Sequence, residues 1–270
     1  MARAELDTPR LEAEALLAEV LGAPRHAAYL EPLLPLTHAE RDRFVAVVQR
    51  RARREPLQYV IGRETFCGLD LTVTPDVLIP RPETEGAVAA VLDAVATVPH
   101  PVVADLGTGS GCLALAVAAA RHDAAVYAVD HSPAALRVAR DNAERLGLAT
   151  RVRFLEGDLF APLAREGIRV DVAVSNPPYV ADHDYERVQP EVRFEPEGAL
   201  RGGPDGLRYY RRIVAEVTNV LAPKGRVVLE LGFGQADAVR GLAERGGFVI
   251  DRLDADFNGI PRIMTLARPT

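Results

Sequence analysis

The sequence predicts an α/β protein whose main domain has a mostly parallel sheet with helices on both faces. Two observations lead to this prediction. From about residue 83 onward, short apolar runs alternate with helical segments, which is typical of βαβ units. Residues 1–62 instead carry apolar positions at helical spacing. We therefore expect a small helical-bundle domain at 1–62, a β-hairpin connector at 63–82 and the sheet domain at 83–270.

The N-terminal domain carries signals for two helices. Thr8 is a suitable N-cap with Pro9 at the first helical position, and Gly22 is a typical helix stop. The segment Thr37-His38-Ala39-Glu40 has the spacing of a capping box. It opens a second long helix, which is expected to end before Pro56.

The connector and the sheet domain are expected to supply the strands. Tyr59–Ile61 and Leu69–Val73 flank Gly62 and Gly68, and we interpret them as a hairpin. In the sheet domain, six apolar runs are predicted to be strands: 102–106, 125–129, 152–155, 170–175, 225–231 and 264–266. Helical segments between the earlier runs favour helices on both faces of a largely parallel sheet.

Composition indicates an ordinary globular protein. The 270 residues are 48% hydrophobic and 26% charged. No apolar run reaches the roughly 18 to 20 residues that span a bilayer, and residues 1–10 lack the apolar core of a signal peptide. Cys67 and Cys112 form no CxxC pattern and have no nearby histidine cluster, so neither a disulfide framework nor a metal site is expected. We expect a cytoplasmic protein that does not bind membranes.

The charge distribution bears on the substrate class. Residues 1–62 hold nine Arg and nine Asp/Glu, which leaves 23 basic and 29 acidic residues in the rest of the chain. A domain that follows nucleic-acid phosphates should carry excess Lys and Arg, so direct nucleic-acid binding is disfavoured. The basic cluster at residues 50–54 is expected to be the solvated end of a helix. Recognition of an acidic partner or of RNA is the alternative for this cluster.

A glycine-rich segment, Gly107-Thr108-Gly109-Ser110-Gly111, follows the apolar run 102–106 and precedes the alanine-rich run 113–120. Glycines at alternate positions allow a tight turn and a close approach of the backbone to a ligand. The N–H groups at the start of the following helix favour a carboxylate or a phosphate. The segment suits a nicotinamide or flavin nucleotide as well as S-adenosylmethionine.

Two acidic residues after later strands are candidate cofactor contacts. Asp130 ends the next predicted strand, 23 positions after Gly107, where a carboxylate can accept hydrogen bonds from ribose hydroxyls. Its alternative role is helix capping, but Ser132-Pro133 already supplies a cap and a first-turn proline. Asp158 follows the third strand, where it could accept from the exocyclic amine of adenine while Leu159 packs against the ring. A plain loop aspartate is the alternative for Asp158.

The stretch Asn176-Pro177-Pro178-Tyr179 directly follows the apolar run 170–175. The two prolines fix φ near −65° and lack N–H groups, and Asn176 is pushed toward extended geometry because it precedes a proline. The Asn176 carboxamide oxygen and the Pro177 carbonyl could then both face one small donor, with Tyr179 as a flat wall. Such a clamp suits a planar NH2 group, either a carboxamide or the exocyclic amine of a base. A strand followed by a rigid turn is the alternative.

With the glycine loop, Asp130 and Asn176–Tyr179 on successive strand ends, the chain resembles the class I S-adenosylmethionine-dependent methyltransferases, which have a Rossmann-like fold. Within that class it resembles the protein-(glutamine-N5) methyltransferases that modify peptide chain release factors. The block Arg81-Pro82-Glu83-Thr84-Glu85, together with a helical N-terminal domain, is the most specific match. Further matches are Pro56–Gly62, Gly68-Leu69, Gly202–Leu207 and Asn258–Arg262. The Arg81–Glu85 block also distinguishes this chain from the sister enzymes that methylate a ribosomal protein.

The resemblance implies methyl transfer from S-adenosylmethionine to nitrogen N5 of the glutamine in a Gly-Gly-Gln loop, with S-adenosylhomocysteine as the product. It implies cofactor contacts from residues 107–111, Asp130, the Asp158-Leu159 loop and Asn176. Family members often carry an aromatic residue at the Leu159 position, so stacking on adenine would become aliphatic packing. The alternatives are an adenine-N6 DNA or RNA methyltransferase, a glutamine methyltransferase of a ribosomal protein, and a non-catalytic nucleotide-binding or ribosome-associated module.

In this interpretation the clamp accepts both N–H groups of the target amide and holds its nitrogen in line with the methyl group. Asn176, Pro177 and Tyr179 are the predicted catalytic residues, and Pro178 joins them in holding the substrate. The segment 181–200 is expected to shape the substrate channel, with a passive surface loop as the alternative. The helical N-terminal domain is expected to recognise the protein substrate, a release factor.

Overall fold

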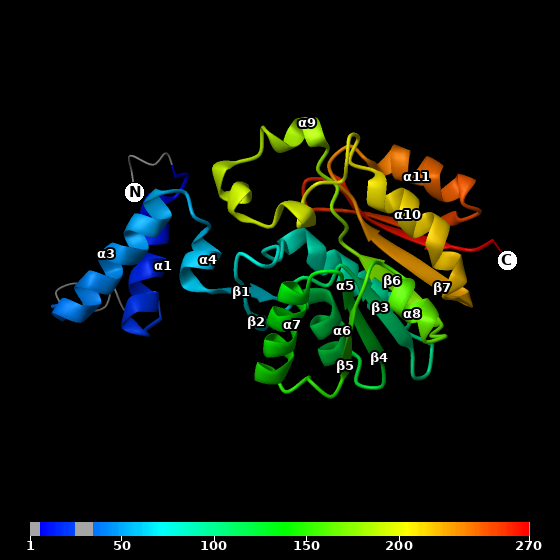
Figure 1. Cartoon of the computed structure of the whole chain (residues 1–270), viewed down its shortest axis with the longest axis horizontal. Helices are drawn as coiled ribbons and strands as arrows, with labels where there is room; N and C mark the ends of the chain where they lie inside the picture. Colours follow the sequence, from blue (N-terminus) through cyan, green and yellow to red (C-terminus); the bar gives the residue numbers. More distant parts are fainter. Residues whose placement is uncertain (1–5, 25–34, 270) are drawn as a thin grey trace. The chain divides into compact units, whose positions relative to one another are not determined.

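The computed structural model describes residues 6–24 and 35–269, which form two compact units (Figure 1). The first unit comprises the described residues up to Arg63 together with Gln189–Phe194. The second unit comprises Glu64–Val188 and the described residues from Glu195 onward. Residues 189–194 therefore belong to the same compact unit as the N-terminal residues, although they lie more than a hundred positions later in the sequence.

The first unit is helical. Its described residues form three α-helices: α1 (Pro9–Leu21), α3 (His38–Ala52) and α4 (Leu57–Ile61). Pro9 begins α1 and Gly22 (φ 59°) ends it, as predicted, although the Thr8 side chain makes no capping hydrogen bond. The predicted capping box of α3 is confirmed. Glu40 N donates to Thr37 Oγ1 at 3.2 Å, and Thr37 N donates to Glu40 Oε2 at 2.8 Å.

The arginine cluster at residues 50–54 is not the solvated helix end that the sequence predicted. Arg51 is only 5% exposed, and its guanidinium contacts both Glu12 and Glu191, with 2.9 Å to Glu191 Oε1. Arg54 also pairs with Glu191, at 2.7 Å. The acidic partners of Arg51 lie 39 and 140 positions away along the chain, so no local pattern could indicate them. The cluster supplies ion pairs inside the first unit.

The predicted hairpin is present, but its first strand lies elsewhere. The hairpin consists of two strands, β1 (Arg63–Phe66) and β2 (Leu69–Thr72). Tyr59–Ile61 belong to α4 instead, and Gly62 ends that helix in the left-handed conformation (φ 85°). Cys67 and Gly68 join the strands with φ angles of 48° and 75°, as the tightest hairpin turns require. A three-residue apolar run is too short to show a period, so the sequence could not separate helix from strand there.

The second unit contains a seven-stranded sheet with the order β5-β4-β3-β6-β7-β9-β8. Its strands are β3 (Val102–Leu106), β4 (Ala125–Asp130), β5 (Val152–Glu156), β6 (Val170–Ser175), β7 (Leu221–Glu230), β8 (Val249–Ala255) and β9 (Pro261–Ala267). Neighbours from β5 through β7 run parallel, whereas β9 pairs antiparallel with both β7 and β8. The predicted mostly parallel sheet is confirmed, and all six predicted runs contribute strands.

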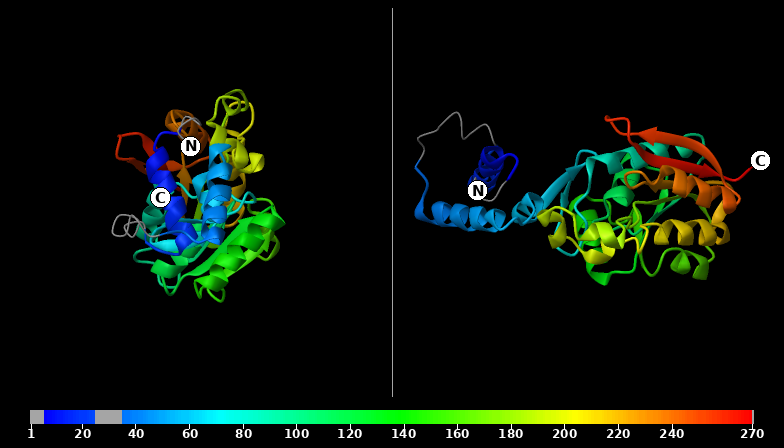
Figure 2. Two further views of the ribbon diagram at one scale, coloured as in Figure 1. Left: turned by 90° about the vertical axis from the view of Figure 1, so that its left-hand side faces the viewer. Right: turned by 90° about the horizontal axis from the view of Figure 1, so that it is seen from above.

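The edge strand β8 was not predicted. Every residue in it is exposed or only partly buried, and charged residues interrupt its apolar positions. Figure 2 shows the two C-terminal strands, coloured orange to red, at one side of the sheet. A strand without a buried face leaves no alternating apolar pattern, and charges are common on such edges. The sequence therefore contained no strand signal for this segment.

Helices cover both faces of the sheet, as predicted (Figure 1). One face carries α5 (Glu85–Ala94), α6 (Cys112–Ala120) and α7 (Pro133–Arg145), and the other carries α8 (Ala161–Arg165), α10 (Arg208–Glu216) and α11 (Ala236–Arg245). Successive strand residues point to opposite faces, so Val103 joins one hydrophobic core and Ala104 the other. None of the helices within 6–24 and 35–269 is long and apolar enough to cross a membrane.

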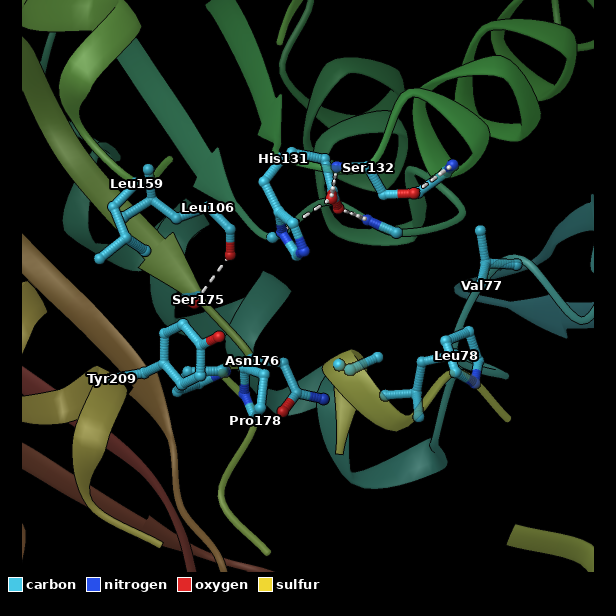
Figure 3. Close-up of a pocket in the computed structure, with 18 of the residues that line it drawn as sticks. Val77, Leu78, Leu106, His131, Ser132, Leu159, Ser175, Asn176, Pro178 and Tyr209 are labelled. Carbon is cyan, nitrogen blue, oxygen red and sulfur yellow. Dashed lines mark hydrogen bonds and ion pairs between the residues drawn. The ribbon is translucent and has the colours of Figure 1, made fainter. Parts of the chain in front are cut away.

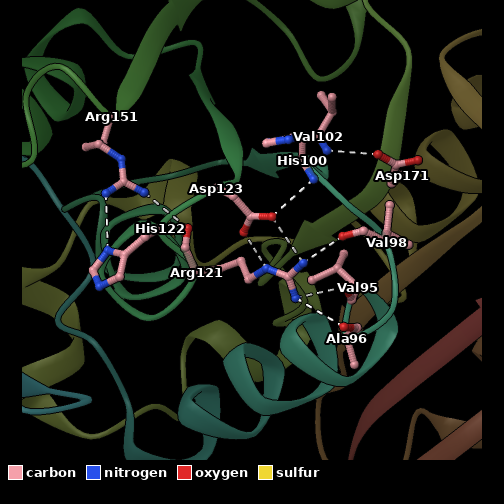
Figure 4. Close-up of polar contacts among 10 residues, drawn as sticks. All are labelled: Val95, Ala96, Val98, His100, Val102, Arg121, His122, Asp123, Arg151 and Asp171. Atoms are coloured by element: carbon pink, nitrogen blue, oxygen red, sulfur yellow. Dashed lines mark hydrogen bonds and ion pairs between the residues drawn. The ribbon is translucent and has the colours of Figure 1, made fainter.

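Arg121 forms a set of hydrogen bonds near the amino ends of the parallel strands (Figure 4). It follows α6 and donates to the carbonyls of Val95 at 3.0 Å and Val98 at 2.6 Å, both beyond the end of α5. It also pairs with the Asp123 carboxylate at 2.6 Å, to which His100 N donates at 3.1 Å. The bond from Arg121, followed by that from His100, lowers the pKa of Asp123 to about 2. These contacts stabilise the scaffold at the edge opposite the carboxyl ends of the parallel strands.

Candidate active site

A cavity of about 290 Å³ lies at the carboxyl ends of the parallel strands (Figure 3). Leu106 at the end of β3, Asp130 at the end of β4 and Ser175 at the end of β6 all line it. The strand order reverses between β3 and β6. Ligands of open α/β sheets bind in the crevice at such a reversal. The cavity is therefore the candidate active site.

The cavity joins residues from widely separated motifs. In Figure 3, His131 and Ser132, which follow β4, lie on one side, and Asn176 and Pro178, which follow β6, lie on the opposite side. Tyr209 of α10 also lines the cavity. One cavity is therefore lined both by the segments predicted to bind a cofactor and by the segment 176–179, which was predicted to clamp an amide.

The loop glycines have two different roles. Gly107 and Gly109 line the cavity with φ of 73° and 55°, and a Cβ atom on either would meet no other atom within 4 Å. They therefore leave an open cradle for a ligand. Gly111 does not line the cavity, and a Cβ there would come within 3.1 Å of Leu115 and 3.2 Å of Ala139. Gly111 is needed for close packing behind the loop.

A buried aspartate supports the loop from behind. Thr108 and Ser110 are 3% and 2% exposed and do not line the cavity. Asp105 Oδ2 accepts from Thr108 Oγ1 at 2.6 Å and from Ala114 N at 3.2 Å, whereas Oδ1 has no partner among the described residues. Burial raises the pKa of Asp105 to about 7. Asp105 was not predicted as a site residue, although an ionisable residue inside an apolar strand is a usable signal.

Asp130 holds the loop against the start of α7. Its Oδ2 accepts from Gly109 N at 2.9 Å, and its Oδ1 accepts from Ser132 N at 2.9 Å. Ser132 caps α7 through a 3.2 Å bond from Ala135 N, as predicted. Asp130 therefore makes local hydrogen bonds even though Ser132 caps the helix. Oδ1 also lies 3.5 Å from Nδ1 of His131. Oδ2 still has a second lone pair for a ligand, and the side chain lines the cavity.

Asp158 and Leu159 both line the cavity. The Asp158 carboxylate is bound by both terminal nitrogens of Arg212, at 3.0 and 2.9 Å. Leu159 is 9% exposed and adopts φ 45°, a left-handed conformation that few residues other than glycine adopt. The backbone at this position is thus strained and places the leucine side chain against the cavity.

The clamp residues divide between the cavity and the core. Asn176, Pro177 and Pro178 line the cavity, and Ser175 before them donates to the Leu106 carbonyl at 2.8 Å. This bond ties the ends of β6 and β3 together. The segment that follows the two strands is therefore held at a fixed place beside the glycine loop.

Tyr179 does not line the cavity. Its carbonyl accepts from Gln235 Nε2 at 3.0 Å, and its ring lies against the backbone of Gly232. Burial raises the pKa of Tyr179 above the ordinary value, so the phenol stays neutral. A Cβ on Gly206 would come within 2.3 Å of the Tyr179 carbonyl oxygen, which explains the glycine in the Gly202–Leu207 segment.

Two irregular segments contribute further lining residues. Pro196 and Ala199 belong to the segment 181–200, which was predicted to shape the substrate channel. Val77 and Leu78, which precede the Arg81–Glu85 block, were not predicted as site residues. Such segments carry no periodic pattern, so only their position next to a motif could have indicated them.

A partly buried ion pair links these two segments. Arg81 is paired with Glu195, which is 5% exposed and also accepts from Ile79 N at 3.0 Å. The pair fixes one wall of the cavity. Within the described parts of the chain, no group of three or more His, Cys, Asp or Glu side chains is arranged to hold a metal ion.

Several solved methyltransferases share this fold. The catalytic domain of hMettl16, solved with a MAT2A 3'UTR hairpin, aligns with a TM-score of 0.62 at 15% identity, over 83% of this chain and 83% of that one. A methyltransferase from Pyrococcus furiosus aligns with a TM-score of 0.55 at 20% identity, over 82% of this chain and 99% of that one. The fold, with its cavity at the strand ends, is that of a Rossmann-like methyltransferase, a class that generally uses S-adenosylmethionine.

Sequence relatives identify the family within this class. Residues 1–62 match the PrmC N-terminal domain, and residues 85–194 match the methyltransferase small domain. The release factor glutamine methyltransferase of Geobacter sulfurreducens is 46% identical over 266 residues, which cover 98% of this chain and 91% of that protein. That of Burkholderia pseudomallei is 46% identical over 256 residues, covering 93% and 90%. The chain belongs to the release factor glutamine methyltransferase family.

Proposed function

We propose that this chain transfers a methyl group from S-adenosylmethionine to nitrogen N5 of the glutamine in the Gly-Gly-Gln motif of peptide chain release factors. The observation that carries the proposal is the single cavity shared by Asn176 and Pro177 with Gly107, Gly109 and Asp130. Relatives that are 46% identical over nearly the whole chain are named release factor glutamine methyltransferases. The relatives support the reaction and the substrate class, and the cavity supports the assignment of residues.

The residues of this cavity fit S-adenosylmethionine. The open cradle at Gly107 and Gly109 lets the backbone approach the cofactor closely. Asp130 would accept hydrogen bonds from the ribose hydroxyls with its remaining lone pairs. Leu159 would pack against the adenine ring, and Asp158 would lie beside the exocyclic amine. In this proposal Thr108, Ser110 and Gly111 act mainly by shaping the loop.

Asp105 is proposed to act on the cofactor only through the loop. It is fully buried and does not line the cavity, and burial raises its pKa to about 7. Its bonds from Thr108 Oγ1 and Ala114 N hold the loop and the start of α6 together.

The chain's own residues position the acceptor. When bound, the cofactor supplies an electrophilic methyl group on a sulfonium sulfur. An amide nitrogen is a weak nucleophile because its lone pair is delocalised into the carbonyl group. Asn176 Oδ1 and the Pro177 carbonyl would each accept one N–H of the glutamine amide and favour pyramidalisation of its nitrogen. Alignment and fixed dipoles of this kind lower the reaction barrier without a strong base.

The clamp also accounts for substrate selectivity. Pro177 and Pro178 keep it rigid because their φ angles are fixed. A substrate without an N–H would leave a buried acceptor unpaired, at a cost of roughly 1–3 kcal/mol. The nitrogen becomes acidic only as the new bond forms, so its proton can pass to water afterwards. Tyr179, which lies behind the clamp, would help to keep water from the amide plane.

The two parts of the chain are proposed to divide the work. Residues 1–62 would recognise the release factor, residues 63–82 would connect, and residues 83–270 would carry the methyltransferase chemistry. The match of residues 1–62 to the PrmC N-terminal domain supports that division. A release factor as the substrate would place the enzyme in the cytoplasm.

The test is incubation of the full chain with labelled S-adenosylmethionine and, in parallel, release factors, ribosomal proteins and DNA. The proposal predicts label on the glutamine of the Gly-Gly-Gln motif. Label on adenine N6, or on a ribosomal protein alone, would contradict it. Failure to bind S-adenosylmethionine in calorimetry would favour a non-catalytic module instead.

A further inference from the structure

Three polar side chains form a hydrogen-bonded row behind the clamp. Asn176 Nδ2 donates to Thr84 Oγ1 at 3.3 Å, and Thr84 Oγ1 donates to Glu230 Oε2 at 2.6 Å. Thr84 is 1% exposed and ends the 3-10 turn η2 (Pro82–Thr84), and Glu230 is 2% exposed and ends β7. Neither Thr84 nor Glu230 lines the cavity. They can therefore act on a substrate only through Asn176.

The chemistry of the row fixes its direction. When Glu230 is ionised it has no proton to give, so the Thr84 hydroxyl must donate its single proton to the Glu230 carboxylate. The Thr84 oxygen is then available to Asn176 only as an acceptor. Only the NH2 half of the Asn176 carboxamide can satisfy that acceptor, which leaves the Oδ1 half for a donor elsewhere.

Thr84 does not serve as a helix cap. It stands at the N-terminal end of α5, where a threonine side chain usually caps the helix. Its hydroxyl makes no capping hydrogen bond there and is directed to Glu230. The backbone of Glu230 is fixed in turn, because Tyr210 Oη donates to its carbonyl at 2.9 Å. Both ends of the Thr84–Glu230 bond are therefore held in place.

Burying the charged form of the Glu230 carboxyl group costs free energy, because the group loses its contact with water. Burial raises its pKa to about 7, although the bond from Thr84 opposes this rise. The charged and titratable groups that face it are Arg81, Glu83, Cys112, Tyr179, Tyr210 and Arg262. The two arginines are paired elsewhere, with Glu195 and Asp256. A buried acid that lacks a direct cationic partner beside a cavity is typical of functional sites.

We propose that Thr84 and Glu230 are positioning residues, which turn the Asn176 carboxamide so that its oxygen faces the amide to be methylated. This inference rests on the proposed function and gives the Arg81–Glu85 block a role in the clamp. Without these two hydrogen bonds, the Asn176 carboxamide can rotate by half a turn. Its NH2 group would then face the N–H groups of the substrate in place of its oxygen. The defect should appear in kcat, while cofactor affinity stays unchanged.

Thr84→Val removes the hydroxyl and nearly preserves the shape of the side chain, whereas Thr84→Ser keeps the hydroxyl. With the full chain, labelled S-adenosylmethionine and a release factor, kcat of Thr84→Val should fall roughly 10- to 100-fold, as expected for a misplaced catalytic group. The Kd for S-adenosylmethionine should stay within about twofold of wild type, and kcat of Thr84→Ser within about threefold.

Thr265→Val is the matched control. Thr265 lies in β9, is 4% exposed, and its Oγ1 has no partner in the described parts of the chain. Removing this hydroxyl changes the same sheet without touching the row. Its kcat should equal that of wild type.

Glu230→Gln tests the row from its other end. Glutamine can donate or accept, so the row loses its fixed direction and kcat should fall. Wild-type kcat should rise as the pH passes about 7 and Glu230 loses its proton, whereas the variant should lack this rise. If Thr84→Val does not fold, Thr84→Ser and Glu230→Gln carry the comparison.

The outcomes separate the two levels of the proposal. Unchanged kcat in Thr84→Val, an equal loss in Thr84→Ser, or the same pH profile in wild type and Glu230→Gln would overturn the inference alone. A wild-type chain that labels no release factor would remove the proposed function, and this inference with it.

Discussion

Glu230→Gln is expected to gain stability relative to wild type as the pH rises from 5 to 8, and to be less active. Glu230 is 2% exposed, and burial raises its pKa from 4.5 to about 7. In the unfolded chain the carboxyl group returns to its ordinary pKa. The folded protein therefore holds the proton more tightly than the unfolded chain does. The contribution of Glu230 to stability is complete below pH 4.5 and is lost as the pH rises through 7.

The size of the effect follows from this shift. One pKa unit corresponds to about 1.4 kcal/mol, so full ionisation of Glu230 lowers the free energy of unfolding by about 3 kcal/mol. Less than about 1 kcal/mol of this is lost by pH 5. Glutamine has a similar shape and no proton to lose. The stability of the variant relative to wild type should therefore rise by about 2–3 kcal/mol, or about 5–10 °C in Tm, between pH 5 and pH 8.

Urea unfolding followed by circular dichroism at several pH values measures this difference. Other titrating groups, including Asp105 with its pKa near 7, are present in both proteins and cancel in the comparison. Two curves of unfolding free energy against pH that run parallel would refute the reasoning. So would a wild type that gains stability over the variant as the pH rises.

Three further changes test the cofactor loop and the scaffold opposite the site. Asp130→Ala should weaken S-adenosylmethionine binding at least about tenfold in calorimetry, because the proposed ribose contact and the bond to Gly109 N are both lost; an unchanged Kd would reassign this residue. Gly109→Ala should also weaken cofactor binding, because alanine at φ 55° costs about 1–2 kcal/mol and its Cβ would enter the cavity; wild-type affinity would show that the cofactor does not approach the loop. Arg121→Ala should lower Tm by removing the bonds at the opposite edge of the sheet, and leave kcat unchanged at temperatures where the variant is folded; a loss of kcat without a loss of Tm would contradict the separation of scaffold and site.

Local sequence patterns predicted those parts of the fold that have a buried face. The predicted strands 102–106 and 170–175 coincide with β3 and β6, whose residues are almost all buried. The pattern failed for Tyr59–Ile61, which form one short helical turn, and for the exposed strand β8. Tyr59–Ile61 are too few to show a period, although Tyr59 and Val60 are buried, and β8 is long enough but lacks a buried face.

In the site, polar residues at the ends of apolar runs were visible from sequence, because parallel strands bring their carboxyl ends to one edge. Asn176 and Asp130 were selected in this way, and both line the cavity. The row behind the clamp was not visible, because Thr84 and Glu230 are 146 positions apart and each is an ordinary residue in its own segment. Contacts of this kind depend on the packing of the folded chain, which no local pattern records.

The most direct test of the account is to map the methyl group on a release factor incubated with S-adenosylmethionine and either wild-type protein or Asn176→Ala. The account predicts one methyl group on the glutamine of the Gly-Gly-Gln motif with wild type and none detectable with the variant. The Kd of the variant for S-adenosylmethionine should remain within about threefold of wild type. Methylation by Asn176→Ala near the wild-type rate would contradict the clamp, and a methyl group on any other residue would contradict the proposed substrate.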